Sequence, residues 1–492
     1  MKSEEFIMTA KSKTLLLGLV PTRRDLDGDF FCNSKVAFAK KLKIEAKLKE
    51  MGIPYVNLDF LNEEGIINNG LDAKKVADYF TEKGVDALFC PHLNFGTEDA
   101  IAKIGKLMNK PLLIWGMRDD APDSAGNRCT DSQCGLFATS KVLQQFHVPY
   151  SYMTNCTLDD PTFERVLRNF LSAASVVKAF RGMRVGQVAV RPETFWSVKC
   201  NERELLEKFS IEIVPITMVE IQDRFNEILE NERELLEKEA ETFKEKYDAQ
   251  VPDDSLIRTA ALKLTFRRWA EEMQLDAVAS NCWGPIRQTA GIASCFAFSE
   301  LTGEGLPIAC ETDVCGAITS VIAQAATQWQ KASFFADITV RHPTNDNAEL
   351  LWHCGVFPCR TACTDCKPVI GRSFDEHRPT VTNFRLAAGD ITICRFDGID
   401  GNYQLFMAQG HSVEGPMTKG AYGWFEFDNW PRVEHKLING PYVHHCAGVH
   451  QNISTVLYEA CKYIPGLTAD PISPGKEEIL SLIHISEPTR RS

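Results

Sequence analysis

Pro307-Ile-Ala-Cys-Glu-Thr-Asp-Val-Cys-Gly-Ala-Ile-Thr-Ser320 combines an apolar run, two acids and the start of an apolar segment that predicts a helix over 317–328. The acids are Glu311 and Asp313, and a second apolar run, 332–337, also ends on a carboxylate, Asp337. Open α/β sheets place their chemistry where buried strands turn into helices. Glu311 and Asp337 therefore predict a divalent-cation site or an acid/base pair, and surface caps are the alternative interpretation.

The residues around this segment predict an α/β domain over 171–345 that carries both acids. Its strands are expected at 185–190, 211–215 and 277–283, with charged helical sequence over 219–248 and an amphipathic helix over 256–273. Alternating strands and helices are typical of a parallel sheet. Polar and aromatic side chains close to the 277–283 strand are candidates for substrate binding, namely Trp283, Arg287 and Gln288.

An N-terminal α/β domain is predicted over 1–170. Buried-strand patterns at 13–20, 55–58, 87–90 and 111–115 alternate with helical patterns, which indicates a second doubly wound parallel sheet. No Gly-x-Gly-x-x-Gly or Walker-type loop follows any of these strands, so no nucleotide site is predicted.

The third segment, 346–478, predicts a β-rich domain. Short alternating strands separated by Gly-Asp and Asp-Gly turns favour an antiparallel, barrel-like sheet. Three histidines near its end, His444, His445 and His450, raise the expectation of a metal site. Residues 479–492 are interpreted as a non-native tail.

Composition limits the partners. The 492 residues carry a formal net charge of −12, which argues against nucleic acid and anionic membranes. No apolar run approaches the roughly 20 residues that span a bilayer. Seventeen cysteines without a secretion signal indicate reduced thiols and a cytoplasmic protein.

Several of these motifs together resemble the L-fucose isomerase / L-arabinose isomerase family. They are Cys310-Glu-Thr-Asp-x-x-Gly-Ala-Ile-Thr319, Phe335-Ala-Asp337 and the late His444-His445 followed by Gly448 and His450. The order of two α/β domains and a β-rich domain is similar to that family over nearly the whole chain.

The resemblance implies a metal-dependent aldose–ketose isomerase acting on a free sugar, with L-fucose as the first expectation and D-arabinose and L-arabinose behind it. It implies Mn²⁺ or another divalent cation held by Glu311, Asp337 and His445, with His353 as a fourth candidate, and Glu311 and Asp337 as the acid/base pair. His444 stands where the fucose enzymes have Asn, which affects the expected substrate.

The same resemblance implies a homo-trimer or hexamer in which the N-terminal domain of a neighbour completes the site. Arg118, at the end of the 111–115 strand, is the candidate sugar contact from that domain.

Two other functions fit parts of the sequence. Cys359-x-x-x-Cys363-x-x-Cys366 has the spacing of a radical-SAM iron–sulfur motif, and Cys354 before it allows a zinc site. Two α/β domains also suit a non-catalytic sugar-binding protein, although that class has no use for Glu311, Asp337 and His445 together.

Overall fold

The computed structural model describes residues 13–25, 34–122, 124–126, 128, 130–372 and 379–484. By their internal contacts these residues form two compact units: 13–178 with 459–464 and 477–484, and 179–458 with 465–476. Within the described ranges no helix is both long and apolar enough to cross a membrane.

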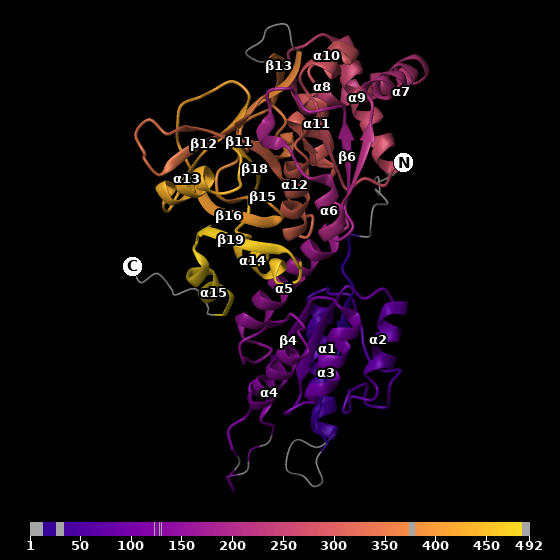
Figure 1. The fold of residues 1–492 in the computed structure, drawn as a ribbon, viewed down its shortest axis with the longest axis vertical. Coiled ribbons are helices and arrows are strands. Elements are labelled where there is room, and N and C mark those ends of the chain that lie inside the picture. Colours follow the sequence, from indigo (N-terminus) through magenta and orange to yellow (C-terminus); the bar gives the residue numbers. More distant parts are fainter. Residues whose placement is uncertain are drawn as a thin grey trace. The chain divides into compact units, whose positions relative to one another are not determined.

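The N-terminal unit is built on a parallel sheet in the order β2-β1-β3-β4-β5 (Figure 1, indigo to purple). Strands β3 and β4 are buried along their whole length, which explains their continuous apolar sequence. The elements are β1 (Leu17–Leu19), α1 (Ser34–Glu50), β2 (Tyr55–Val56), α2 (Ala73–Glu82), β3 (Ala87–His92), α3 (Glu98–Met108), β4 (Leu112–Gly116), α4 (Ser132–Gln145), β5 (Ser151–Tyr152) and α5 (Pro161–Phe180). Two C-terminal helices contribute residues to this unit, α14 (Ser454–Cys461) and α15 (Lys476–His484). Residues 485–492 of the predicted tail lie outside the described residues.

The second unit begins with a parallel sheet in the order β10-β9-β6-β7. Helix α7 starts with a capping box, in which Thr217 and Glu220 satisfy each other's backbone N–H groups. The elements of this part are β6 (Arg184–Val188), η1 (Trp196–Val198), α6 (Glu202–Phe209), β7 (Glu212–Ile216), α7 (Met218–Asn231), α8 (Arg233–Lys246), β8 (Asp248–Ala249), α9 (Asp253–Glu272), β9 (Ala277–Ser280), α10 (Gly284–Ala290), α11 (Cys295–Gly303), β10 (Ile308–Ala309), η2 (Cys310–Thr312) and α12 (Val314–Ala326).

The rest of the unit is a closed antiparallel barrel, formed by β16, β15, β18, β11, β12 and β17, with β16 pairing back onto β17. The Asp400-Gly401 turn between β15 and β16 has positive φ at both residues, as a tight hairpin requires, and confirms the Asp-Gly turn in the sequence. The elements are β11 (Phe334–Arg341), β12 (Ala348–His353), η3 (Cys359–Thr361), β13 (Val369–Arg372), β14 (Pro379–Arg385), β15 (Asp390–Ile399), β16 (Asn402–Val413), β17 (Ala421–Phe427), α13 (Trp430–Asn439), β18 (His445–Val449) and β19 (Leu467–Ser473).

The structure corrects one sequence-based assignment. The 332–337 run was expected to be a strand of the second parallel sheet, yet it forms β11 of the barrel and continues past Asp337 to Arg341. The buried start of β11 explains the error, because Phe334, Phe335 and Ala336 form the continuous apolar run that is typical of a parallel core strand. Helix α12 packs against β9 on one side and against β15 and β18 on the other, so it joins the sheet to the barrel.

Candidate active site

Glu311 lies in a strained turn between β10 and α12. Its backbone is left-handed, with φ 56° and ψ 21°, and Thr312 follows with φ 58°. Two consecutive residues of this kind without a glycine are costly, and such strain gathers at functional sites. The turn points the Glu311 side chain into the protein, where the residue is 4% exposed.

Asp313 is the N-cap of α12, and it has two further partners. Its Oδ1 accepts from the Gly316 N–H at 2.9 Å. The Arg395 guanidinium binds both carboxylate oxygens and also reaches Asp397 at 2.7 Å. Burial opposes ionisation of Asp313, but Arg395 and His445 hold its pKa well below the usual range. Asp313 is therefore a buried, ionised acceptor.

His445 is oriented by that carboxylate. Its Nδ1 lies 2.8 Å from Oδ2 of Asp313, so we assign the proton to Nδ1 and leave Nε2 as an acceptor. A carboxylate that fixes the tautomer in this way is the usual companion of a metal-binding histidine.

Asp337 faces the free nitrogen of His445. The two residues are direct partners in the β11–β18 pairing, and Oδ1 of Asp337 lies 3.4 Å from Nε2 of His445. Among the described residues that Oδ1 has no hydrogen-bond partner. With its proton on Nδ1, His445 presents Nε2 to Oδ1 as a second acceptor, and a cation would satisfy this pair.

His353 stands on the other side, next to Glu311. Its Nε2 is 3.8 Å from Oε2 of Glu311, and within the described part of the chain neither atom has a hydrogen-bond partner. The Cys354 N–H points at Nδ1 at 2.9 Å, which places the proton of the neutral ring on Nε2. Burial lowers the pKa of His353, but the Asp337 and Glu311 carboxylates have the larger effect. The pKa of His353 is therefore raised well above its usual value. In both protonation states Nε2 carries a proton and can donate.

Glu311 is ionised in this setting. Burial works against its charge, but the neighbouring His353 and His445 and the Trp283 indole lower its pKa to about 2. The Trp283 N–H donates to Oε1 at 2.9 Å. Thus Oε1 is occupied by Trp283, while Oε2 is left for another ligand.

Of the predicted substrate-binding residues, some lie beside Glu311 or Asp337 and others do not contact them. Trp283 contacts Glu311 directly and is 42% exposed, and His444 lies 3.9 Å from Asp337 with its pKa lowered by burial and by His445. Arg287 is half-buried in α10, with an Nε that has no partner among described residues, and Gln288 beside it is exposed. Arg118 is exposed at the end of β4 in the N-terminal unit.

The cysteine motif is not assembled as a cluster of three thiols. Cys363 and Cys366 form a disulfide with Cα atoms 5.2 Å apart, while buried Cys359 contacts the Ser299 hydroxyl at 3.5 Å. The sulfur atoms of Cys363 and Cys366 and a carboxylate oxygen of Asp365 lie within 4.8 Å of one another, close enough to hold a metal ion together. Cys359 is not part of this group.

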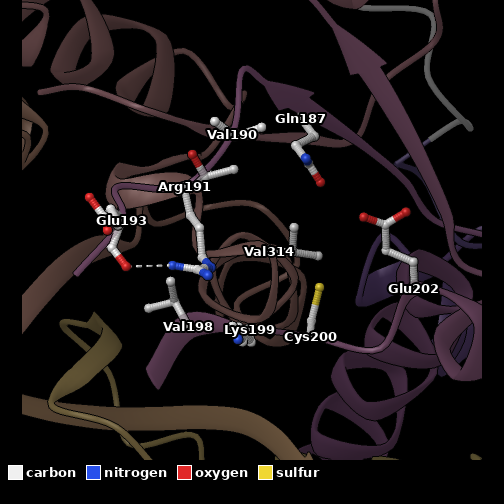
Figure 2. A pocket seen from close by; sticks show the side chains of 10 residues that line it. Gln187, Val190, Arg191, Glu193, Val198, Lys199, Cys200, Glu202 and Val314 are labelled. Atoms are coloured by element: carbon white, nitrogen blue, oxygen red, sulfur yellow. Dashed lines mark hydrogen bonds between the residues drawn. The ribbon is translucent and has the colours of Figure 1, made fainter. Parts of the chain in front are cut away.

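A pocket of about 610 Å³ lies at the carboxyl end of β6, against the start of α12 (Figure 2). Its wall includes Thr312, directly after Glu311, whose Oγ1 lacks a hydrogen-bond partner in the described residues. The 190–202 segment, which supplies most of the lining, carries Phe195, whose ring contacts Trp283 and His445 with centroids 5.2 and 6.1 Å away. The lining residues are Gln187, Val190, Arg191, Glu193, Val198, Lys199, Cys200, Glu202, Thr312 and Val314.

Sequence reasoning missed Arg395, Asp397 and Phe195. Arg395 and Asp397 lie on β15, in a strand whose alternation marks them as ordinary inward positions, and no local signal links them to Asp313. Phe195 lies in a loop, where one aromatic residue gives no indication of function.

Comparisons with known proteins identify similar sugar isomerases. The N-terminal domain profile of fucose/sulfoquinovose isomerases matches residues 18–181. A sulfoquinovose isomerase of Priestia megaterium is 23% identical over 80% of this chain and 88% of its own length. A sulfoquinovose isomerase of Alkalicoccus urumqiensis is 25% identical over 67% of this chain and 73% of its own. A D-allose-bound periplasmic solute-binding protein of Actinobacillus succinogenes covers 64% of this chain and 92% of its own at 11% identity, but a TM-score of 0.17 supports no argument.

The domain match and the relatives define a class of enzyme: an aldose–ketose isomerase, which is an intramolecular oxidoreductase. Within that class the domain match and the relatives support the fucose isomerase-like family, in agreement with the resemblance drawn from its motifs.

Proposed function

We propose that this isomerase acts on a free, sulfonated aldose of the sulfoquinovose type, at a divalent-metal site formed by Glu311, Asp337 and His445. The observation that carries the proposal is a set of acceptors without partners around two histidines: His353 interacts electrostatically with Glu311 and Asp337, and His445 with Glu311. Oε2 of Glu311 and Oδ1 of Asp337 have no hydrogen-bond partner among described residues, and Nε2 of His445 faces Asp337 as an acceptor. Buried acceptors of this kind are uncommon without a ligand.

The donor set fits Mn²⁺ or Mg²⁺, because carboxylate oxygens with one imidazole suit hard cations. When bound, such an ion supplies Lewis acidity that favours a negative charge on two adjacent sugar oxygens. The Asp313 carboxylate, itself held by Arg395, keeps Nε2 of His445 directed at Asp337.

Aldose–ketose isomerisation moves one proton between C1 and C2 and another between O1 and O2. Ionised Glu311 and the half-buried Asp337 are the two carboxylates positioned to take up and return these protons. The Nε2–H of His353 faces Glu311 and can donate to a sugar oxygen placed between them.

Sulfoquinovose is favoured over the neutral sugars for two reasons. The relatives are named sulfoquinovose isomerases. The pocket beside Thr312 is lined by two cations, Arg191 and Lys199, which suit a sulfonate, while Gln187, Glu193 and Glu202 offer partners for hydroxyl groups (Figure 2).

A substrate panel tests the proposal directly. Sulfoquinovose, L-fucose, L-arabinose, D-arabinose and glucose 6-phosphate are incubated with the enzyme and Mn²⁺, and ketose formation is measured. We expect sulfoquinovose to be converted most efficiently, chelation to abolish turnover, and Mn²⁺ to restore it better than Zn²⁺. Full activity after exhaustive metal removal, or turnover confined to the phosphate, would overturn the proposal.

Lys199→Met tests the role of the pocket. Lys199 packs over the Trp196 ring at 3.6 Å and is otherwise exposed, so its loss leaves the fold intact. Losing one charge-assisted contact predicts a KM for sulfoquinovose about 10-fold higher or more, with kcat and the turnover of any neutral sugar unchanged. Lys238→Met, an exposed lysine of α8, is the matched control. An unchanged KM for sulfoquinovose in Lys199→Met would show that the pocket is not part of the substrate-binding site.

We also expect a homo-trimer or hexamer in which the N-terminal unit of a neighbour contributes to the site. Light scattering combined with activity measurements tests this expectation, and a fully active monomer would contradict it.

A further inference from the structure

Cysteine thiols lie beside Glu311 that the proposed isomerisation does not use. Cys282 follows β9 and Cys310 immediately precedes Glu311, and both are buried. Their sulfur atoms and a carboxylate oxygen of Glu311 all lie within 4.8 Å of one another. Cys295, at the start of α11, is buried and interacts electrostatically with both thiols.

We propose that Cys282, Cys310 and Glu311 form a second metal site, selective for soft or borderline cations such as Zn²⁺ and Cd²⁺. Two thiolates with one carboxylate match the preferences of these ions, whereas Mn²⁺ and Mg²⁺ prefer oxygen ligands. The site is distinct from the group of Asp337, His444 and His445.

The two oxygens of Glu311 divide between these sites. The Cys282 thiol donates to Oε1 at 3.4 Å, whereas Oε2 faces His353 and has no hydrogen-bond partner in the described chain. A cation that binds both sulfur atoms releases both thiol protons to solvent and takes the place of the Cys282 proton in the contact with Oε1. Trp283 donates a hydrogen bond to the same oxygen and is 42% exposed.

Occupation of this site has a consequence for catalysis, which rests on the proposed function. A cation held through Oε1 neutralises part of the Glu311 charge and fixes the carboxylate on the thiol side. Glu311 then becomes a weaker base and a weaker ligand for the cation near Asp337. Zn²⁺ should therefore inhibit the enzyme even when Mn²⁺ is saturating.

Cd²⁺ binding to the full-length protein, reduced and stripped of metal, tests the site independently of activity. The readout is the ultraviolet charge-transfer absorption of cadmium thiolates. Cys282→Ala and Cys310→Ala should each weaken Cd²⁺ binding by about 10–100-fold or more, since even changes around metal ligands have effects of that size. Cys461→Ala, which removes a buried thiol of α14, should leave the absorption unchanged, and so should Asp337→Asn.

Circular dichroism shows which variants fold. Glu311→Gln is a third variant: it leaves both thiols in place and should also weaken Cd²⁺ binding. Undiminished Cd²⁺ binding in the folded variants among these three would overturn the site. This result is independent of whether any sugar is turned over.

Inhibition is measured separately, with Zn²⁺ added at saturating Mn²⁺. Cys282→Ala should need at least about 10-fold more Zn²⁺ for the same inhibition, in line with its weaker metal binding. Equal sensitivity of wild type and Cys282→Ala would show that Zn²⁺ acts through Asp337 and His445, and would overturn the inhibitory role.

Discussion

Asp313 accepts a hydrogen bond from Nδ1 of His445 at 2.8 Å, although the two residues are 132 positions apart in the sequence. Asp313 begins α12, and His445 begins β18 of the barrel. This bond ties the helix that follows Glu311 to the strand that pairs with Asp337. One buried carboxylate thus links the three residues proposed to hold the metal.

Asp313→Asn should weaken Mn²⁺ binding by about 10–100-fold, because the amide no longer fixes the tautomer of His445. It also leaves Arg395 with one carboxylate partner fewer, which destabilises the fold by about 3–5 kcal/mol. At saturating Mn²⁺ the loss of kcat should be milder than for changes at Glu311. Calorimetric Mn²⁺ titration and denaturant unfolding measure the two effects.

Thr217→Ala is the control, because it removes an N-cap of α7 outside the site and costs only about 1 kcal/mol. If Asp313→Asn binds Mn²⁺ as tightly as this control, the orienting role of Asp313 is wrong.

The sequence was sufficient for the local parts of this arrangement. The strand-to-helix pattern around Glu311 predicts a turn that carries an acid, and the parallel sheets follow from alternating strands and helices. What it lacked was the pairing of distant strands. The run ending at Asp337 has the same apolar sequence whether it joins a parallel sheet or a barrel, and only its pairing with β18 distinguishes the two.

The contacts that Arg395 and Trp283 make with the site could not be predicted for the same reason, because they join residues that are distant in the sequence. Arg395 is one of three charged residues of β15, and its role depends on Asp313 lying opposite it. Trp283 was predicted as a sugar contact, which remains a prediction, but its bond to Glu311 could not be predicted from spacing.

Glu311→Gln and Asp337→Asn should each lower kcat by about 10²–10⁴-fold, since each removes a proposed acid/base group and a proposed metal ligand. Steady-state kinetics at saturating Mn²⁺ gives the comparison. Asp346→Asn, a change to an exposed acid in the loop between β11 and β12, should leave kcat unchanged. Activity within a few-fold of wild type in either site variant would exclude that residue from proton transfer.

His353→Gln distinguishes a donor from a metal ligand. Because Nε2 carries a proton in both states of the ring, we expect His353 to donate to the sugar rather than bind metal. The variant should then lower kcat by about 10-fold or more, in the lower range of general-acid effects, and keep Mn²⁺ affinity within a few-fold. A large loss of Mn²⁺ affinity would instead support the fourth-ligand role that the resemblance implies.

Acid should remove a part of the stability that Glu311 provides. Its pKa falls from an ordinary 4.5 to about 2 on folding, because the effects of His353, His445 and Trp283 outweigh that of burial. A carboxyl whose pKa is lowered in the folded state stabilises the fold above its unfolded pKa, and this contribution is lost as the pH falls through the folded value. The window for Glu311 is therefore about pH 4.5 down to about pH 2.

Urea unfolding of the metal-free protein between pH 6 and pH 2 measures this contribution, with Glu311→Gln as the comparison. Gln cannot ionise, so the difference in unfolding free energy between wild type and variant should be largest at pH 6 and shrink steadily below about pH 4.5. Asp313 keeps its own acid dependence in both proteins, because its pKa is lowered by Arg395, and it cancels in the difference. Parallel curves for wild type and Glu311→Gln would show that Glu311 is not held as a stabilised carboxylate.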